Sequence, residues 1–201
     1  MGATSFPLLG WGKGAQIQSG ARHADPREAR MDFLELAAGR YSERRFAQTP
    51  VEPEKLDRIL EAGRLAPTAK NRQPQRILVV QSPEGLAKMD RCTECRFGAP
   101  LVLVLAYDME VACRHPDVAD FGTVDLGIVG THMMLEAAEL GVHSCWVGLI
   151  DPSELRRQFG VPRTVRIVSV MPMGYPSERS HPAPLHLRSK DLSELVFRET
   201  Y

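Results

Sequence analysis

Apolar residues recur at helical spacing in some stretches of the chain and form short continuous runs in others. Helices are predicted from Met31 to Gly39, onward from Pro53, onward from Ser82, from Val118 to Leu140, onward from Asp151, and from Asp191 to Arg198. The continuous runs predict buried strands over Arg76 to Gln81, Pro100 to Tyr107, Val142 to Ile150 and Val165 to Met173. Interleaved helices and strands favour an α/β sandwich of three layers, with the strand that begins at Pro100 near its centre.

Residues that favour helix ends occur at the borders of these stretches. Pro53 and Pro152 suit the first turn of a helix, where no intrahelical N–H bond is lost, and Ser82 and Asp151 suit the N-cap. Gly141 suits the C-cap of the long helix, because glycine adopts positive φ without strain. These residues indicate where the helices begin and end, which the apolar pattern alone does not determine.

Residues 1–30 show neither a helical nor a strand period and are rich in Gly, Ala, Ser, Arg and Gln. Gly10, Gly12 and Gly14 imitate a dinucleotide-binding loop, but no strand precedes them and no helical pattern follows. We therefore expect an N-terminal extension, either flexible or wrapped around a partner subunit, and then one domain over residues 31–201.

The composition favours a protein that acts on small molecules. Lys and Arg number 25 and balance 25 Asp and Glu, so the chain has no overall field to attract nucleic acid or an anionic membrane. A hydrophobic content of 43% suits one domain or one subunit of an intertwined oligomer. No apolar run reaches the roughly 20 residues of a membrane span, and the N-terminus lacks a secretory pattern, so a cytoplasmic protein is expected.

Four cysteines are too few for a disulfide scaffold in a chain of this length, and we expect them to be reduced. Cys92 and Cys95 form a CxxC pair, which occurs in redox sites and in zinc sites. The sequence offers no second pair of ligands to complete a zinc cluster, so two thiols on a partly buried helix are the simpler interpretation. Redox activity of the pair stays open.

The stretch from Arg64 to Pro74 leaves a predicted helix and leads into a buried strand. Pro67 ends the helix, and Pro74 biases Gln73 toward an extended conformation. A shaped loop is therefore predicted. The side-chain amides of Asn71 and Gln73 both donate and accept hydrogen bonds, which suits the edge of a heterocycle.

Two small basic clusters are candidates for binding an anion. Arg40 and Arg44 flank Ser42, so two guanidinium groups and a hydroxyl can close on one phosphate. Arg188 and Lys190 form a second cluster near the C-terminus. Solvated surface residues explain either cluster when it is considered alone.

The chain lacks the patterns of an enzyme that relies on its own acid–base groups. It contains no G-x-S-x-G, H-E-x-x-H, P-loop or Rossmann fingerprint. Thr131 and His132 lie within the long predicted helix, and His132 is interpreted either as a proton donor or as a hydrogen-bonded interior histidine. The missing machinery indicates that a bound cofactor carries the chemistry.

Taken in order, four motifs resemble those of the nitroreductase family of FMN flavoproteins. The resemblance covers Met31 to about Val196 and rests on Arg40-x-Ser42-x-Arg44-x-Phe46, on Ala66-Pro67-Thr68-Ala69-x-Asn71-x-Gln73-Pro74, on Asp125-x-Gly127 with Met134-Leu135-x-Ala137-Ala138-x-x-Gly141, and on Ser144-Cys145-Trp146-Val147-Gly148. Gly174-Tyr175-Pro176 is similar to the family's glycine turn after its last core strand. Each motif is weak alone, whereas the ordered set is specific.

The resemblance implies a nitroreductase-like fold, in which helices flank a central mixed sheet, and an intertwined homodimer with FMN at the subunit interface. By motif match, the residues that would bind FMN are Arg40, Tyr41, Ser42 and Arg44 with Arg188 or Lys190 at the phosphate, Pro67, Thr68, Asn71 and Gln73 at the isoalloxazine ring, and Val147, Gly148 and Leu149 from the partner subunit. Thr131 and His132 would lie near the substrate pocket. The flavin would carry the chemistry, without a catalytic side chain or a metal.

The resemblance further implies an oxidoreductase in which NADH or NADPH gives a hydride to the flavin and a small oxidant, such as a nitroaromatic or a quinone, then takes its place in a ping-pong scheme. Two departures leave the substrate class open: Gln75 stands where many members have Trp, and Thr131-His132 where many have Gln-Asn. The alternatives are other flavin chemistry on the same fold, either reductive dehalogenation or ring dehydrogenation, and a flavin-binding protein without catalysis.

Overall fold

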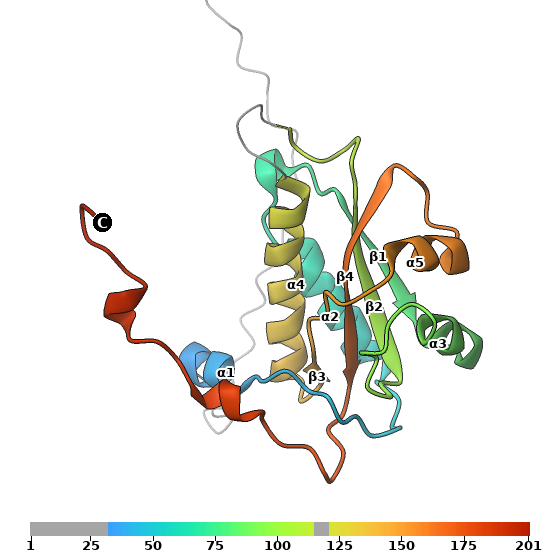
Figure 1. Cartoon of the computed structure of the whole chain (residues 1–201), viewed down its shortest axis with the longest axis horizontal. Helices are drawn as coiled ribbons and strands as arrows, with labels where there is room; N and C mark the ends of the chain where they lie inside the picture. The colour runs from blue at the N-terminus through green and yellow to red at the C-terminus, as the bar shows by residue number, and fades with distance from the viewer. Residues whose placement is uncertain (1–31, 115–120) are drawn as a thin grey trace, which may run out of the picture. The chain divides into compact units, whose positions relative to one another are not determined.

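The computed structural model describes residues 32–114 and 121–201 (Figure 1). The predicted extension over residues 1–30 and the first residues of the predicted 118–140 helix lie outside the described residues. The helices are α1 (Phe33–Gly39), α2 (Pro53–Leu65), α3 (Pro83–Met89), α4 (Phe121–Glu139) and α5 (Pro152–Phe159), with 3-10 helices η1 (Ala69–Asn71), η2 (Pro184–Leu187) and η3 (Leu192–Glu194). The strands are β1 (Gln75–Val80), β2 (Leu101–Asp108), β3 (His143–Ser144) and β4 (Val165–Gly174).

The four strands form one sheet in the order β1-β2-β4-β3. Strand β2 pairs with β1 on one side and with β4 on the other, so the predicted central place of this apolar strand is confirmed. All three ladders are antiparallel. Within the described ranges, the parallel pairing expected of a mixed sheet is limited to an isolated bridge between Ser42 and Ser144 beside β3.

Helices cover both faces of the sheet, and the expected three layers are confirmed (Figure 1). Alternate residues of β2 point to opposite faces, because side chains alternate along a strand. Leu103 and Leu105 join the core beneath α2 and α4, while Val102 and Val104 join the core beneath α3 and α5. The fully apolar β2 is therefore buried on both sides.

Helix α4 packs closely against Trp146 because position 130 is a glycine. A Cβ added at Gly130 would lie 2.3 Å from Cζ3 of Trp146, so the indole ring occupies the space that any side chain there would need. Trp146 follows β3, and this contact holds the chain after β3 against the middle of α4. Close helix packing thus fixes the segment that leads to residues 147–149.

The predicted helix ends are confirmed where local chemistry defines them. The Ser82 side chain accepts a hydrogen bond from the backbone N–H of Gly85, and that of Asp151 accepts from Ser153 and Glu154. Gly141 follows α4 with a φ of 71°, which is the left-handed conformation that glycine favours.

Three predicted elements differ in the structure. The strand expected over Val142 to Ile150 is limited to β3, after which Cys145 donates one hydrogen bond to Pro172 of β4 and Val147 bridges Val170. The C-terminal helix expected from Asp191 to Arg198 is reduced to the single turn η3. Both stretches carry apolar side chains, which are mostly buried in the first stretch and exposed in the second. Residues 92–95, expected on a helix, form turns after α3.

Candidate functional site

The first predicted basic cluster, the basic turn of residues 40–46, runs along the edge of the sheet next to β3. The backbone N–H of Glu43 donates to the carbonyl of Ser144 at 3.0 Å, and Ser42 forms a parallel bridge with Ser144. Farther on, the N–H of Ala47 donates to the carbonyl of Tyr175 at 2.8 Å. Backbone bonds at both ends therefore set the course of the turn, and its side chains project from a fixed main chain.

The arginines of this turn have different environments. Nη1 of Arg45 donates to the carbonyl of Arg179 at 2.7 Å and lies 3.0 Å from Nε2 of His181. Nη1 of Arg44 reaches only the carbonyl of Ser42, at 3.2 Å. The guanidinium of Arg40 has no hydrogen-bond or ion-pair partner among the described residues. Arg40 and Arg44 are thus the cations that remain available to an external anion.

The same arginines affect a buried thiol. Burial raises the pKa of Cys145, and the nearby Arg44, Ser42 and Arg40 act in the opposite direction. Three of the residues predicted at the phosphate therefore lie near Cys145, directly after β3.

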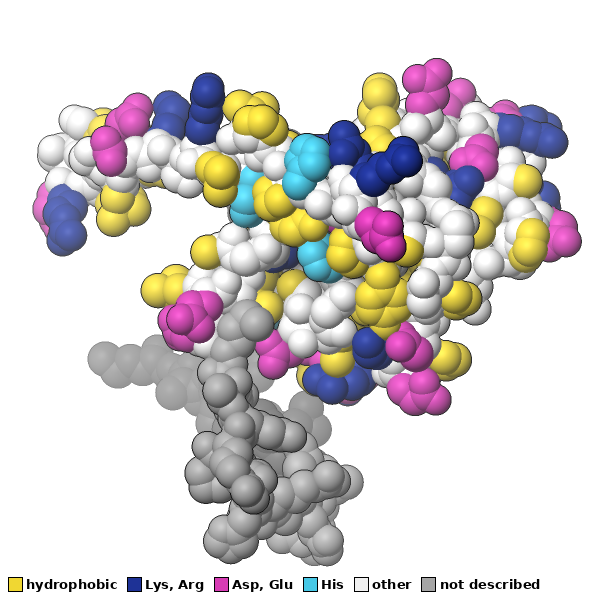
Figure 2. Space-filling model, turned by 90° about the horizontal axis from the view of Figure 1, so that it is seen from below, with side chains coloured by type: hydrophobic (Ala, Val, Ile, Leu, Met, Phe, Trp, Pro, Cys, Tyr) yellow, Lys and Arg dark blue, Asp and Glu magenta, His cyan; other side chains and the backbone are white. Residues whose placement is uncertain are grey.

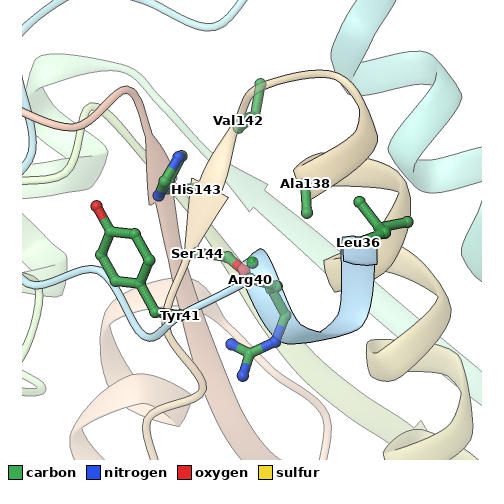
Figure 3. A pocket seen from close by; sticks show the side chains of 8 residues that line it. Leu36, Arg40, Tyr41, Ala138, Val142, His143 and Ser144 are labelled. Atoms are coloured by element: carbon green, nitrogen blue, oxygen red, sulfur yellow. The ribbon is translucent and has the colours of Figure 1, made fainter. Parts of the chain in front are cut away.

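A cavity of about 160 Å³ lies between α1, α4 and β3. Its lining includes Arg40, Tyr41, His143 and Ser144, and Figure 3 shows the Tyr41 and His143 rings side by side, with Arg40 next to Ser144 and directed away from both rings. The two rings meet edge to face with centroids 4.9 Å apart. The hydroxyl of Ser144 is buried and has no hydrogen-bond partner. An unpaired buried hydroxyl beside a free guanidinium is suited to accept a polar ligand.

Burial also changes the acid–base behaviour of the two rings. It raises the pKa of the Tyr41 phenol, although the hydrogen bond between Tyr41 and Ser180 acts against this. It lowers the pKa of His143, an effect that the nearby carboxylate of Glu43 opposes. Tyr41 is therefore a neutral donor and His143 is mostly uncharged near neutral pH.

The segment after β4 brings the C-terminal basic cluster to the same end of the molecule. The N–H of Ser177 donates to the carbonyl of Arg45 at 2.8 Å, and Nε2 of His186 lies 3.1 Å from the carbonyl of Ala38. Figure 2, seen from below, shows histidine and basic side chains gathered where this segment leaves the body. Arg188 is exposed two residues beyond His186, whereas Nζ of Lys190 lies 3.8 Å from Glu194.

The predicted loop after α2 is shaped by its backbone and held by α4. Lys70 and Asn71 have φ values of 53° and 52°, and the N–H of Ala69 donates to Oδ1 of the buried Asp125 at 2.8 Å. Gln73 has a φ of 49°, so the extended conformation expected before proline is wrong. The reason is a local bond, because the N–H of Gln73 donates to Oγ1 of Thr68 at 3.0 Å.

The side chains of this loop are open to solvent. Pro67, Asn71 and Gln73 are exposed, and Thr68 is half-buried because its hydroxyl holds Gln73. Oδ2 of Asp125 is buried without a partner, although Oδ1 is bonded. The loop therefore presents amide groups outward from a fixed main chain, as a heterocycle-binding loop requires.

Residues 147–149 differ in how much they can offer a ligand. Val147 is 5% exposed, and its backbone bonds twice with Val170, so its side chain belongs to the core. Leu149 is 71% exposed, and a Cβ added at Gly148 would meet nothing within 4 Å. The hydroxyl of Thr93 donates to the carbonyl of Leu149 at 2.7 Å and fixes this part of the backbone.

The candidate residues form two groups at different ends of α4. Ala138 lines the cavity with Arg40 and Ser144, whereas Asp125 holds the loop that carries Asn71. Thirteen residues separate Asp125 from Ala138 on the helix, which is about 20 Å at the usual rise per residue. Figure 1 shows the C-terminal end of α4 next to β3 and its other end far from that strand.

The candidate residues also differ in where they lie along one chain. Residues 147–149 follow β3, where Val147 bridges Val170 of β4. Within one chain, the loop from Pro67 to Gln73 is held at the other end of α4 from the cavity that Arg40 lines.

The residues predicted for the substrate pocket lie on the exposed surface of α4. Oγ1 of Thr131 donates to the carbonyl of Gly127 at 2.7 Å, and Nδ1 of His132 lies 2.9 Å from the carbonyl of Ile128. An interior position for His132 is therefore wrong. Both side chains bond to carbonyls of their own helix.

The cysteine pair forms no metal site among the described residues, where no group of three possible ligands is found. Cys92 is buried, and burial raises its pKa to about 11. A thiol with such a pKa is protonated near neutral pH and is a poor nucleophile. No helix of residues 32–114 or 121–201 is long and apolar enough to cross a bilayer.

Sequence reasoning missed the residues that hold these groups in place. Glu43 is 1% exposed although it is charged, and Ser180 and His143 surround it. Asp125 was part of a motif, but its contact with the loop was not expected, and Thr93 was not considered. Their partners are far away in sequence, so no local signal points to them.

Comparison with known proteins shows which family the chain is similar to. A model of the nitroreductase family matches residues 37–97 and 92–175. An NADH dehydrogenase from Thermus thermophilus is 30% identical over 195 residues, which cover 76% of the chain and 91% of that protein.

Solved structures extend the comparison to three dimensions. A nitroreductase family protein from Clostridium difficile 630 superposes with a TM-score of 0.80 at 38% identity, covering 85% of the chain and 100% of that protein. An FMN-dependent nitroreductase from Clostridium difficile R20291 superposes with a TM-score of 0.71 at 26% identity, covering 84% and 99%. The chain belongs to the nitroreductase family.

Proposed function

We propose that the chain is an FMN-dependent oxidoreductase that takes a hydride from NADH or NADPH and passes it to a small oxidant such as a nitroaromatic or a quinone. Family membership supports the reaction class, and the relatives named for NADH and for FMN support the donor and the cofactor. The observation that carries the proposal is local: the guanidinium groups of Arg40 and Arg44 pair with no described acid, and Arg40 lines the same cavity as Ser144, whose hydroxyl has no partner.

The FMN phosphate is assigned to the basic turn. Arg40 lines a cavity with Ser144, Ser42 forms a bridge with Ser144, and Arg44 is near enough to Cys145 to oppose the rise in its pKa that burial causes. Guanidinium forks bind phosphate oxygens in a bidentate way. Arg188 is the preferred third cation, because Lys190 already lies 3.8 Å from Glu194 whereas Arg188 is exposed next to the segment that touches α1. Tyr41 would contribute as a neutral neighbour.

The isoalloxazine ring is assigned to the loop from Pro67 to Gln73 of a second subunit. The loop and the basic turn of one chain are anchored about 20 Å apart along α4. In a dimer, the loop of one subunit would lie next to the basic turn of the other. The side-chain amides of Asn71 and Gln73 would then lie at the polar edge of the ring. The backbone of Gly148 and Leu149 then approaches the ring from the chain that binds the phosphate.

Exposed apolar surface supports a homodimer. Helix α1 has no buried residue, and Phe33 and Leu34 are 61% and 71% exposed. The C-terminal segment exposes Leu187, Leu192 and further apolar side chains, and in Figure 2 it projects from the body. Contiguous apolar surface of this kind marks an interface. An intertwined partner would cover it.

Bound FMN supplies the centre that accepts and donates the hydride. The chain's own residues bind the phosphate, orient the ring and leave one face open for donor and oxidant in turn. Thr131 and His132 remain candidates for the substrate side, because they are exposed on α4 between the two groups. The cytoplasmic location expected from the composition stays a prediction.

The test uses the purified full-length chain. We expect a yellow protein that releases FMN on denaturation, loses its colour with NADH or NADPH under anaerobic conditions, and regains it with a quinone or a nitroaromatic. Colour that neither donor removes would favour a flavin-binding protein without this activity. A colourless protein that takes up no added FMN would contradict the whole proposal.

A further inference from the structure

Glu43 is a buried charge in the middle of the basic turn. It is 1% exposed, and its Oε1 accepts hydrogen bonds from the backbone N–H groups of Arg44 at 2.9 Å and Arg45 at 2.7 Å. A buried carboxylate is costly unless hydrogen bonds compensate for the lost water. These two bonds meet that need and, in doing so, fix the peptide groups that carry both arginines.

The second carboxylate oxygen holds the C-terminal segment. Oε2 accepts a hydrogen bond from the hydroxyl of Ser180, whose oxygen also lies 2.9 Å from the Tyr41 hydroxyl. Nδ1 of His143 lies 3.8 Å from Oε2. One side chain therefore joins the basic turn, β3 and the segment that leads to Arg188.

The charge of Glu43 is compensated without the guanidinium groups. Among the described residues, no ion pair joins it to Arg44 or Arg45, because Nη1 of Arg44 bonds to the Ser42 carbonyl and Nη1 of Arg45 to the Arg179 carbonyl. A carboxylate this close could have neutralised either cation. Backbone N–H groups and a hydroxyl satisfy it instead, and Arg44 stays available.

We propose that Glu43 is a positioning residue that gives the site its preference for a phosphorylated flavin over riboflavin. The inference rests on the proposed function. Glu43 acts through the main chain of Arg44 and through the docking of the segment before Arg188, and it does not touch the ligand. Its loss would misplace the phosphate-binding cations and leave the ring loop on α4 unchanged.

The experiment compares the affinity of the full-length protein for FMN and for riboflavin, which has the same ring and no phosphate. We expect Glu43→Ala to weaken FMN binding by about tenfold or more, because two bonds to a charged acceptor are lost, and to leave riboflavin binding within about twofold. Glu43→Gln keeps an oxygen for the two N–H groups and should retain most of the preference. Glu178→Ala, an exposed neighbour of Ser180 with the same change of charge, serves as the control.

If Glu43→Ala loses affinity for both flavins equally, Glu43 has only a structural role and the proposal is overturned. Unchanged affinity for FMN would overturn it as well. Should Glu43→Ala fail to fold, Ser180→Ala removes a single hydroxyl and permits the same comparison, with FMN alone weakened several-fold. An equal change in the affinity of Ser180→Ala for FMN and for riboflavin would also overturn the proposal. A wild-type protein without any preference for FMN would instead disprove the phosphate assignment itself.

Discussion

Arg44 and Arg45 are neighbours in the chain, but their guanidinium groups have different uses. Arg45 is bonded to the carbonyl of Arg179 and lies beside His181, which ties the basic turn to the segment after β4. Arg44 reaches only a carbonyl two residues away. At the scale of single residues, the turn thus separates a structural arginine from one that is free for a ligand.

This difference predicts unequal effects of removing the two side chains. We expect Arg44→Ala to weaken FMN binding by about 1.5–3 kcal/mol, the usual contribution of a hydrogen bond to a charged group. Arg45→Ala removes the same charge next to it and should weaken binding less. Fluorescence titration with FMN measures both, and equal effects would argue against a phosphate contact from Arg44.

The sequence indicated which residues of the turn are basic, but not how they are held. The spacing of Arg40, Ser42 and Arg44 is visible in one stretch, so their convergence could be predicted. Glu43 lies between them and looks like an ordinary surface acid, because its partner Ser180 is 137 residues away. Burial of a charge depends on such distant contacts, which no local pattern contains.

At the scale of elements, helix ends were easier to predict than strands. Ser82 and Asp151 bond to backbone groups two or three residues away, so the chemistry that starts α3 and α5 is local. The apolar run from Val142 to Ile150 predicts a strand, whereas after Ser144 its hydrogen bonds to β4 are limited to one from the N–H of Cys145 to the carbonyl of Pro172 and two between Val147 and Val170. Apolar side chains indicate that a segment is buried, but a buried segment need not form continuous β-sheet hydrogen bonds.

The contact between α4 and Trp146 predicts a loss of stability for Gly130→Ala. A Cβ at this position would lie 2.3 Å from the indole, and such overpacking costs about 1–3 kcal/mol. Alanine gains about 0.5–1 kcal/mol over glycine within a helix, which offsets only part of this cost. Urea unfolding should therefore show a lower free energy of unfolding.

The control for this substitution is Glu139→Ala, at an exposed position of the same helix. It should change the free energy of unfolding by no more than about 0.5 kcal/mol. A stabilised Gly130→Ala variant would mean that Trp146 moves aside without cost, and the close packing of α4 would then not fix the chain after β3.

At the scale of the whole molecule, apolar surface is concentrated at the ends of the described domain. Helix α1 and the segment that begins with η2 expose many large side chains, while the sheet and the helices on its two faces enclose most of theirs. A chain that is stable on its own rarely leaves so much apolar surface at its extremities. The distribution suits a subunit that is completed by a partner.

Removal of residues 191–201 tests this view. The deletion eliminates the exposed Leu192, Leu195, Val196, Phe197 and Tyr201 but retains Arg188 and Lys190. We expect light scattering to show a dimer for the full chain and a monomer for the shortened one at micromolar concentration, with loss of bound FMN. Arg198→Ala, a polar change in the same segment, should leave the dimer intact. A shortened chain that still has the mass of a dimer would contradict the predicted role of the segment.

The loop that carries Asn71 has a kinetic consequence. Lys70, Asn71 and Gln73 all hold positive φ, a conformation that costs non-glycine residues about 1–3 kcal/mol each, and the hydrogen bonds that Asp125 and Thr68 accept from the loop backbone maintain it. We expect a loop whose backbone is held in this way to need little rearrangement when a ring arrives, so that its association rate is set by encounter. Substitutions of the Asn71 side chain that spare the backbone should then act chiefly on how long the flavin stays bound.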